Sequence, residues 1–160
     1  MTGTRPHVAV IGASEPDPAR DAQAREVGAE LARAGAVLVC GGMGGVMEAS
    51  CAGARQQGGT TVGLLPGDDR SAANPHLDVA LPTGLGELRN GLIVRAADAV
   101  IAVGGGYGTL SEIGFALRLG RAVVGLGTWE LARAGVADHG VVEASDPADA
   151  VARALAAAGR

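Results

Sequence analysis

The sequence predicts an α/β fold in which one doubly wound parallel β-sheet carries helices on both faces. Strand-like segments alternate with helical patterns along the chain, which is typical of this fold class. The strand-like segments are continuous apolar runs, as expected for strands buried on both faces of a parallel sheet. Three of them end in turns that contain glycine, at residues 12–14, 41–45 and 104–108. These features favour one Rossmann-like domain over residues 1–160.

The first half of the chain carries clear signals for the ends of its elements. Asp17-Pro18 has the residue types preferred at a helix N-cap and first helical position, and Gly35 is a suitable stop. Gly58-Gly59 ends a second helix, and Pro66-Gly67 closes a strand. The expected elements are a strand at His7–Ile11, a helix at Asp17–Ala34, a strand at Ala36–Cys40, a helix at Val46–Gln57 and a strand at Thr60–Leu65.

The second half follows the same alternation, with one segment that is hard to interpret. Residues 129–134 could form one or two helical turns. Asp146-Pro147 opens a terminal helix with the same residue pair as Asp17-Pro18. The other expected elements are a short strand at Leu77–Leu81, a helix at Gly86–Ala97, a strand at Asp98–Val103, a helix from about Leu110 to Gly120, a strand at Arg121–Leu126 and a short last strand at Val141–Val142.

Composition excludes several classes of function. Hydrophobic residues make up 48% of the chain and charged residues 19%, which favours a packed core over disorder. The formal charge of −4 argues against a general nucleic-acid binder. No apolar run reaches the roughly 18 residues of a membrane span, and the N-terminus does not resemble a signal peptide. We therefore expect a cytoplasmic protein that binds neither membranes nor nucleic acid.

No metal site or cofactor is expected from the sequence. Cys40 and Cys51 lack metal-ligand spacing, and the three histidines are scattered along the chain. In a reducing compartment the two cysteines are expected to be small buried apolar residues.

The glycine-rich turn at residues 104–108 is the strongest candidate for a binding site. It connects a buried strand to a helix, and the first N–H groups of a helix bind anions well when glycines let a ligand approach the backbone. Thr109 can add a hydroxyl donor or cap the helix. Glu112 lies three residues later, the spacing of a capping box. Glu112 is thus either a helix cap or a carboxylate that faces a bound phosphate.

All three glycine-containing turns should meet at the carboxyl edge of the sheet, where ligands bind in open α/β folds. This convergence predicts a site for a phosphorylated small molecule. Ser14 in the first turn is either a ligand contact or a helix cap. The predicted ligand-binding residues are Gly12, Ser14, Gly42, Gly44, Gly105, Gly106, Tyr107, Gly108 and Thr109.

The run from Gly104 to Glu112, Gly-Gly-Gly-Tyr-Gly-Thr-Leu-Ser-Glu, resembles the hallmark of LOG-like proteins, often misnamed lysine decarboxylases. That hallmark reads Pro-Gly-Gly-x-Gly-Thr-x-x-Glu, so Gly104 replaces the proline. Arg89 matches the family's catalytic arginine, and Asn90 stands where the family has lysine. The resemblance extends over about residues 7–155, and the sequence looks closer to a bacterial branch that is similar to molybdenum-cofactor carrier proteins than to the LOG enzymes.

This resemblance implies two alternative functions. LOG enzymes hydrolyse the N-glycosidic bond of nucleoside 5′-monophosphates, and Arg89 and Glu112 would be the catalytic residues. Molybdenum-cofactor carriers instead bind a phosphorylated pterin without catalysis. The ligand would be a nucleoside monophosphate or a molybdopterin-like molecule. Arg89 alternatively lies on a solvated helix face. The resemblance also implies a homodimer or larger homo-oligomer.

Overall fold

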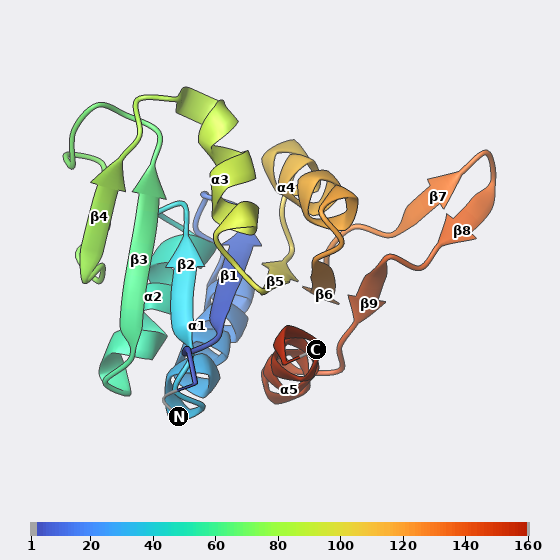
Figure 1. Cartoon of the computed structure of the whole chain (residues 1–160), viewed down its shortest axis with the longest axis horizontal. Helices are drawn as coiled ribbons and strands as arrows, with labels where there is room; N and C mark the ends of the chain where they lie inside the picture. Colours follow the sequence, from blue (N-terminus) through green and yellow to red (C-terminus); the bar gives the residue numbers. More distant parts are fainter. Residues whose placement is uncertain (1–2, 160) are drawn as a thin grey trace.

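The structure is a computed structural model that describes residues 3–159. Its main sheet has seven strands in the order β4-β3-β2-β1-β5-β6-β9, and every neighbouring pair is parallel (Figure 1). The strands are β1 (His7–Gly12), β2 (Val37–Cys40), β3 (Thr60–Leu65), β4 (Val79–Pro82), β5 (Ala99–Val103), β6 (Ala122–Leu126) and β9 (Val141–Glu143). The predicted doubly wound parallel sheet is confirmed.

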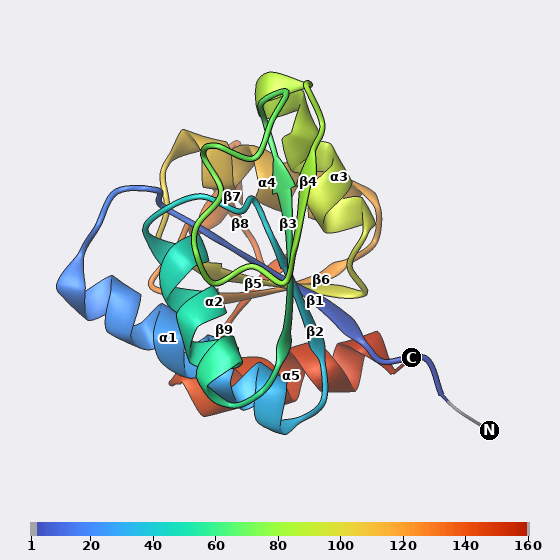
Figure 2. The ribbon, with the colours of Figure 1, turned by 90° about the vertical axis from the view of Figure 1, so that its left-hand side faces the viewer.

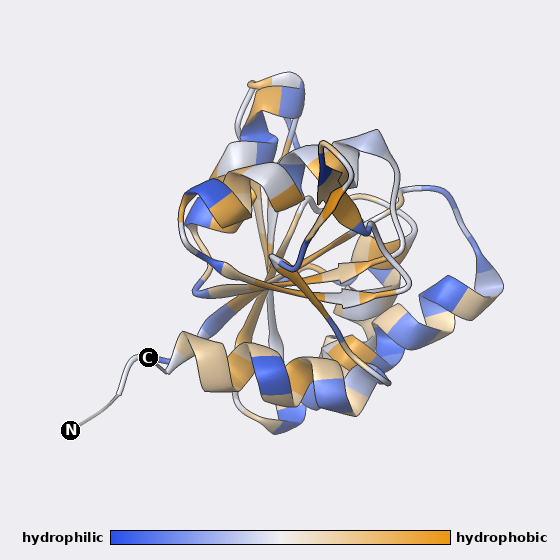
Figure 3. Ribbon diagram, turned by 90° about the vertical axis from the view of Figure 1, so that its right-hand side faces the viewer, coloured by the Kyte–Doolittle hydropathy of each residue, from blue (hydrophilic) through white to orange (hydrophobic). Residues whose placement is uncertain are grey.

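Helices cover both faces of this sheet (Figure 2). The helices are α1 (Pro18–Arg33), α2 (Val46–Gln56), α3 (Asn90–Arg95), α4 (Tyr107–Arg118) and α5 (Pro147–Ala158), and a short 3₁₀ turn, η1 (Gly86–Arg89), precedes α3. One core cluster joins alternate residues of β1, such as Val8 and Val10, to α1, α2 and α5. A second cluster joins Ala9 and Ile11 to α3 and α4. Successive residues of one strand therefore serve opposite faces, which explains the continuous apolar runs (Figure 3).

Two glycines allow α1 and α2 to pack at close range. A Cβ added at Gly28 would overlap the carbonyl oxygen of Ser50, and one added at Gly53 would overlap that of Arg25. The backbones of the two helices are therefore in direct contact. This contact fixes the position of α2, which begins directly after the turn that follows β2.

The structure corrects the interpretation of residues 129–134. These residues do not form helical turns; instead β7 (Leu131–Arg133) and β8 (Val136–Asp138) form an antiparallel hairpin that projects from the body of the fold (Figure 1). Its two-residue turn places Ala134 at φ 50° and Gly135 at φ 80°. Such a turn needs positive φ at both central residues, and alanine rarely adopts it, so Ala134-Gly135 is only a weak hairpin signal.

The N-terminus of α4 is a second correction. The helix begins at Tyr107, its N-cap is Gly106, and no side chain caps it. Thr109 is thus the third helical residue, which excludes the alternative of a capping box between Thr109 and Glu112. The Asp-Pro starts of α1 and α5 are confirmed, because Asp17 accepts a hydrogen bond from Arg20 N and Asp146 accepts one from Asp149 N. Within residues 3–159, no helix combines the length and apolarity needed to cross a membrane.

Candidate functional site

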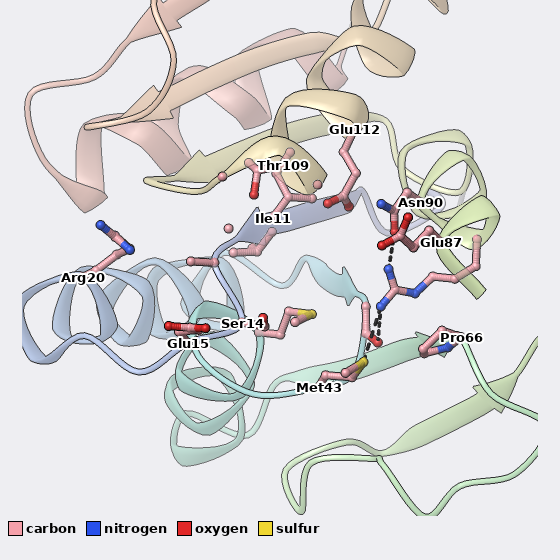
Figure 4. A pocket seen from close by; sticks show the side chains of 18 residues that line it. Ile11, Ser14, Glu15, Arg20, Met43, Pro66, Glu87, Asn90, Thr109 and Glu112 are labelled. Carbon is pink, nitrogen blue, oxygen red and sulfur yellow. Dashed lines mark hydrogen bonds between the residues drawn. The ribbon is translucent and has the colours of Figure 1, made fainter.

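A cavity of about 550 Å³ lies at the carboxyl ends of β1, β2 and β5. The chain places β2, β3 and β4 on one side of β1, and β5, β6 and β9 on the other. The cavity is therefore at the point where strand order reverses, the usual ligand site of open α/β sheets. Its lining includes Ser14, Arg20, Met43, Glu87, Asn90, Thr109 and Glu112, which Figure 4 labels.

Arg89 is the buried cation of this cavity. Its side chain comes from η1, and only 9% of the residue is exposed. Its Nη1 donates to Asn90 Oδ1, and Nη2 donates to the carbonyl oxygen of Gly41 at 3.4 Å. Nε is buried and has no hydrogen-bond partner among residues 3–159. Burial lowers the pKa of Arg89, but a guanidinium stays charged in proteins, so this group is suited to an incoming anion.

Glu112 is a buried carboxyl group on α4. The residue is 7% exposed, and its side chain forms no hydrogen bond with the part of the chain that the structure describes. Burial raises its pKa from the usual 4.5 to about 8, although the nearby charge of Arg89 acts in the opposite direction. At neutral pH the carboxyl group is therefore mostly protonated and can both donate and accept a hydrogen bond.

The loop before α4 is held by the segment that follows β6. Thr128 Oγ1 donates to the carbonyl oxygen of Gly104 at 2.6 Å, and Trp129 Nε1 donates to that of Gly106 at 3.0 Å. These bonds use carbonyl groups of the loop. The N–H groups of the first turn of α4 have no intrahelical acceptor and can bind an anion.

The first two glycine-containing turns pack against each other beside the cavity. Val46 N, at the start of α2, donates to the carbonyl oxygen of Ala13 at 3.0 Å. A Cβ on Gly45 would lie 2.7 Å from the carbonyl oxygen of Ser14. This close approach brings the ends of β1 and β2 to the same side of the cavity.

The structure brings most of the predicted site residues together. Those that line the cavity are Gly12, Ser14, Arg89, Gly106, Gly108, Thr109 and Glu112. Gly42, Gly44 and Gly105 belong to the same turns but are not part of the lining. Tyr107 is also outside it: the residue is 83% exposed, and the centroid of its ring lies 5.6 Å from that of Trp129. The roles of all these residues in ligand binding stay predictions.

Several lining or supporting residues were missed by the sequence analysis. Glu15 lines the cavity from the loop after β1, Arg20 lines it from the first turn of α1, and Glu87 lines it from η1. Thr128 and Trp129 lie outside the cavity lining and support the loop before α4 through their hydrogen bonds. The position of Arg20 in the first turn of α1, just after a glycine-containing turn, was a usable signal. Within the described residues, no cluster of three or more His, Cys, Asp or Glu could hold a metal ion.

Comparison with known proteins gives matches over most of the chain. A sequence model for the SLOG cluster4 family matches residues 5–151. An uncharacterised protein from Archaeoglobus fulgidus is 46% identical over 119 residues, which are 74% of this chain and 78% of that protein.

Two similar solved structures have names that state a ligand. The molybdenum cofactor binding protein of the phototrophic bacterium Rippkaea orientalis is 31% identical with a TM-score of 0.85, over 95% of this chain and 96% of that chain. The molybdenum cofactor carrier protein of Chlamydomonas reinhardtii is 30% identical with a TM-score of 0.84, over 98% of this chain and 100% of that chain. The resemblance expected from the sequence is confirmed.

Proposed function

This chain belongs to the SLOG cluster4 family, and on that basis we propose that it binds a phosphorylated pterin of the molybdenum-cofactor type and acts as its carrier. The cavity at the strand reversal is the proposed binding site. The observation that carries the proposal is the combination, in one cavity, of an uncapped helix N-terminus and the buried Nε of Arg89 without a partner. Both features favour a ligand that carries an anionic group.

The chemistry of the remaining lining supports an unreactive cargo. Met43 and Met47 offer a polarisable apolar surface on which a flat ring can pack. Protonated Glu112 offers a hydrogen-bond donor at neutral pH, whereas stabilising a developing positive charge needs the ionised carboxylate. The two solved relatives named for the molybdenum cofactor share this fold over nearly their whole length.

A nucleoside 5′-monophosphate phosphoribohydrolase is the second candidate. It is favoured by Arg89 and Glu112, which line the same cavity and interact electrostatically. A carboxyl group with a pKa of about 8 can protonate a leaving base as a general acid. A ligand phosphate would occupy the N-terminus of α4, and Arg89 would orient the sugar or phosphate.

One experiment distinguishes the two functions. The purified protein is titrated with molybdopterin by absorbance, and separately incubated with a panel of nucleoside 5′-monophosphates while free base is measured. Saturable pterin binding without base release is expected. Base release that Glu112→Gln abolishes, and that the exposed control Glu130→Gln retains, would establish the hydrolase instead.

We also propose that the protein is a homodimer or larger homo-oligomer that pairs through α3 and α4. Several large apolar residues are exposed on η1, α3, α4 and the C-cap of α4: Leu88 is 79% exposed, Leu92 40%, Phe115 48% and Leu119 37%. η1, α3 and α4 are neighbours in the fold, and large exposed apolar patches are uncommon on monomers. Light scattering of the wild type should give a multiple of the chain mass, and Leu88→Glu should shift it toward one chain. A monomeric wild type would contradict this.

A further inference from the structure

The backbone at Gly104 leaves space for a side chain from another element. Gly104 has φ +56°, and its N–H donates to the carbonyl oxygen of Leu126 at 2.9 Å. A Cβ added here would overlap Arg20 Nε and would lie 2.7 Å from Cδ of the same side chain. The guanidinium of Arg20 therefore lies directly on the backbone of the turn that precedes α4. A proline, present here in the LOG-like hallmark, would lose the hydrogen bond and would not adopt this φ.

Arg20 has no strong partner of its own. Its side chain is 36% exposed, and the nearest carboxylate oxygen, on Asp17, lies 4.0 Å from Nη2. Asp17 already caps α1 by accepting from Arg20 N at 3.0 Å. Within residues 3–159, the guanidinium donates no hydrogen bond. Its fork of N–H groups is thus available to an anion.

The two cations of the cavity lie at different places along it. Figure 4 shows Arg20 at the end opposite Asn90 and Glu87, with Thr109 and Glu112 on α4 between them. Arg89 is hydrogen-bonded to Asn90 and so belongs to the Asn90 end. Arg20 lies against Gly104, which precedes the N-cap of α4 by two residues, and Arg20, Gly106 and Gly108 all line the cavity.

We infer that Arg20 is a second anion-binding residue, which clamps a phosphomonoester of the ligand against the N-terminus of α4, and that Gly104 admits its side chain. This inference rests on the proposed function, since it names which group of the phosphorylated ligand lies at this end. A phosphomonoester carries close to two negative charges above its second pKa of about 6. The backbone N–H groups and the guanidinium fork together satisfy several of its oxygens.

The test uses the protein's single tryptophan as a reporter, because Trp129 is hydrogen-bonded to the loop. Inorganic phosphate is titrated at pH 8 while Trp129 fluorescence is recorded. Arg20→Ala should raise the Kd for phosphate about tenfold, the loss expected for one charge-assisted interaction. The matched control is Arg25→Ala, an exposed arginine of the same helix, which should leave Kd unchanged.

The outcomes separate this inference from the proposed function. Equal phosphate affinity of the wild type and Arg20→Ala would overturn the role of Arg20 while leaving the anion site intact. No response of the wild type to phosphate, in fluorescence or calorimetry, would contradict the anion site and therefore the proposed function as well.

A double-mutant cycle tests the link to Gly104. Gly104→Ala should weaken phosphate binding when Arg20 is present, because the added Cβ displaces the guanidinium, and should have no further effect in the Arg20→Ala background. The same loss in both backgrounds would overturn the link, since it would come from backbone strain in the loop. Circular dichroism and thermal unfolding of each variant establish that it is folded.

Discussion

The two ends of the cavity differ in how their arginines are held. Arg89 is 9% exposed and bonded to Asn90 and Gly41, whereas the side chain of Arg20 is 36% exposed and donates no hydrogen bond within residues 3–159. The Arg89 end is the inner end of the cavity, and the Arg20 end is the outer one. Folding has already removed most solvent from the inner end, and the same burial raises the pKa of the nearby carboxyl group of Glu112. The outer end, at Arg20, is still partly exposed to solvent. A charge at the inner end should therefore affect both stability and ligand binding, whereas a charge at the outer end should affect mainly ligand binding.

The largest effect expected is on stability, through Glu112→Gln. The pKa of Glu112 is raised from 4.5 to about 8 in the folded protein, so the folded state binds the extra proton between these values. Wild-type stability should consequently fall as pH rises from about 4.5 to about 8. The amide of Gln does not ionise, so the variant avoids the cost of a buried negative charge. It should be more stable than the wild type at pH 8.5 by a few kcal/mol, at about 1.4 kcal/mol per pKa unit.

Urea unfolding at pH 5 and at pH 8.5 measures this difference. Glu130→Gln serves as the control, since Glu130 is exposed on the segment before β7. A Glu112→Gln variant whose advantage over the wild type is the same at both pH values would contradict a buried carboxyl group with a raised pKa.

The next largest effect concerns the inner cation. Arg89→Met keeps much of the volume but removes the charge, and the Kd for a phosphorylated ligand should rise about a hundredfold, near the upper end for a charge-assisted hydrogen bond. The pKa of Glu112 should rise further, because the charge of Arg89 lowers it in the wild type. Carboxyl-carbon NMR of labelled Glu112 follows that change directly. An unchanged pKa in Arg89→Met would show that the two groups do not interact.

The difference between the ends also shows what a sequence can predict. The sheet and its helices were predictable because apolar runs, Asp-Pro starts and glycine stops are local signals, and they placed the three turns at one edge. The position of Glu112 near the cavity followed from the same logic, whereas Arg89 was predicted from the resemblance to LOG-like proteins. The burial of Glu112 did not, because its spacing from Thr109 also fits a capping box, and only the start of α4 at Tyr107 excludes that interpretation.

The outer end depends on contacts between distant parts of the chain. Arg20 meets the backbone of Gly104, and Trp129 donates to Gly106, although neither residue belongs to a recognisable motif. The β7–β8 hairpin was missed for a different reason, since its turn uses Ala134 at φ 50°. Local propensity could not reveal these features, because each is set by tertiary packing or by an unusual backbone conformation.

A smaller effect is expected for the support of the loop. Trp129→Phe removes the hydrogen bond to Gly106 and should weaken phosphate binding about fivefold, the equivalent of roughly 1 kcal/mol for one neutral hydrogen bond. Calorimetry replaces fluorescence here, because the reporter is lost. The matched variant Tyr107→Phe keeps the ring next to Trp129 and should bind as the wild type does. A larger loss in Tyr107→Phe than in Trp129→Phe would assign the support to the phenol instead.

The smallest effect expected is on salt dependence, and it compares the two ends directly. Exposed charges are screened by salt, with a Debye length of about 10 Å at 0.1 M, whereas buried charges are screened much less. Phosphate binding should weaken a few-fold when salt is raised from roughly 0.02 M to 0.2 M, and most of that dependence should come from Arg20. Fluorescence titrations at both salt concentrations should therefore give a shallower dependence for Arg20→Ala than for Arg89→Met. A shallower dependence for Arg89→Met than for Arg20→Ala would mean that Arg89, despite its burial in the free protein, accounts for most of the salt dependence.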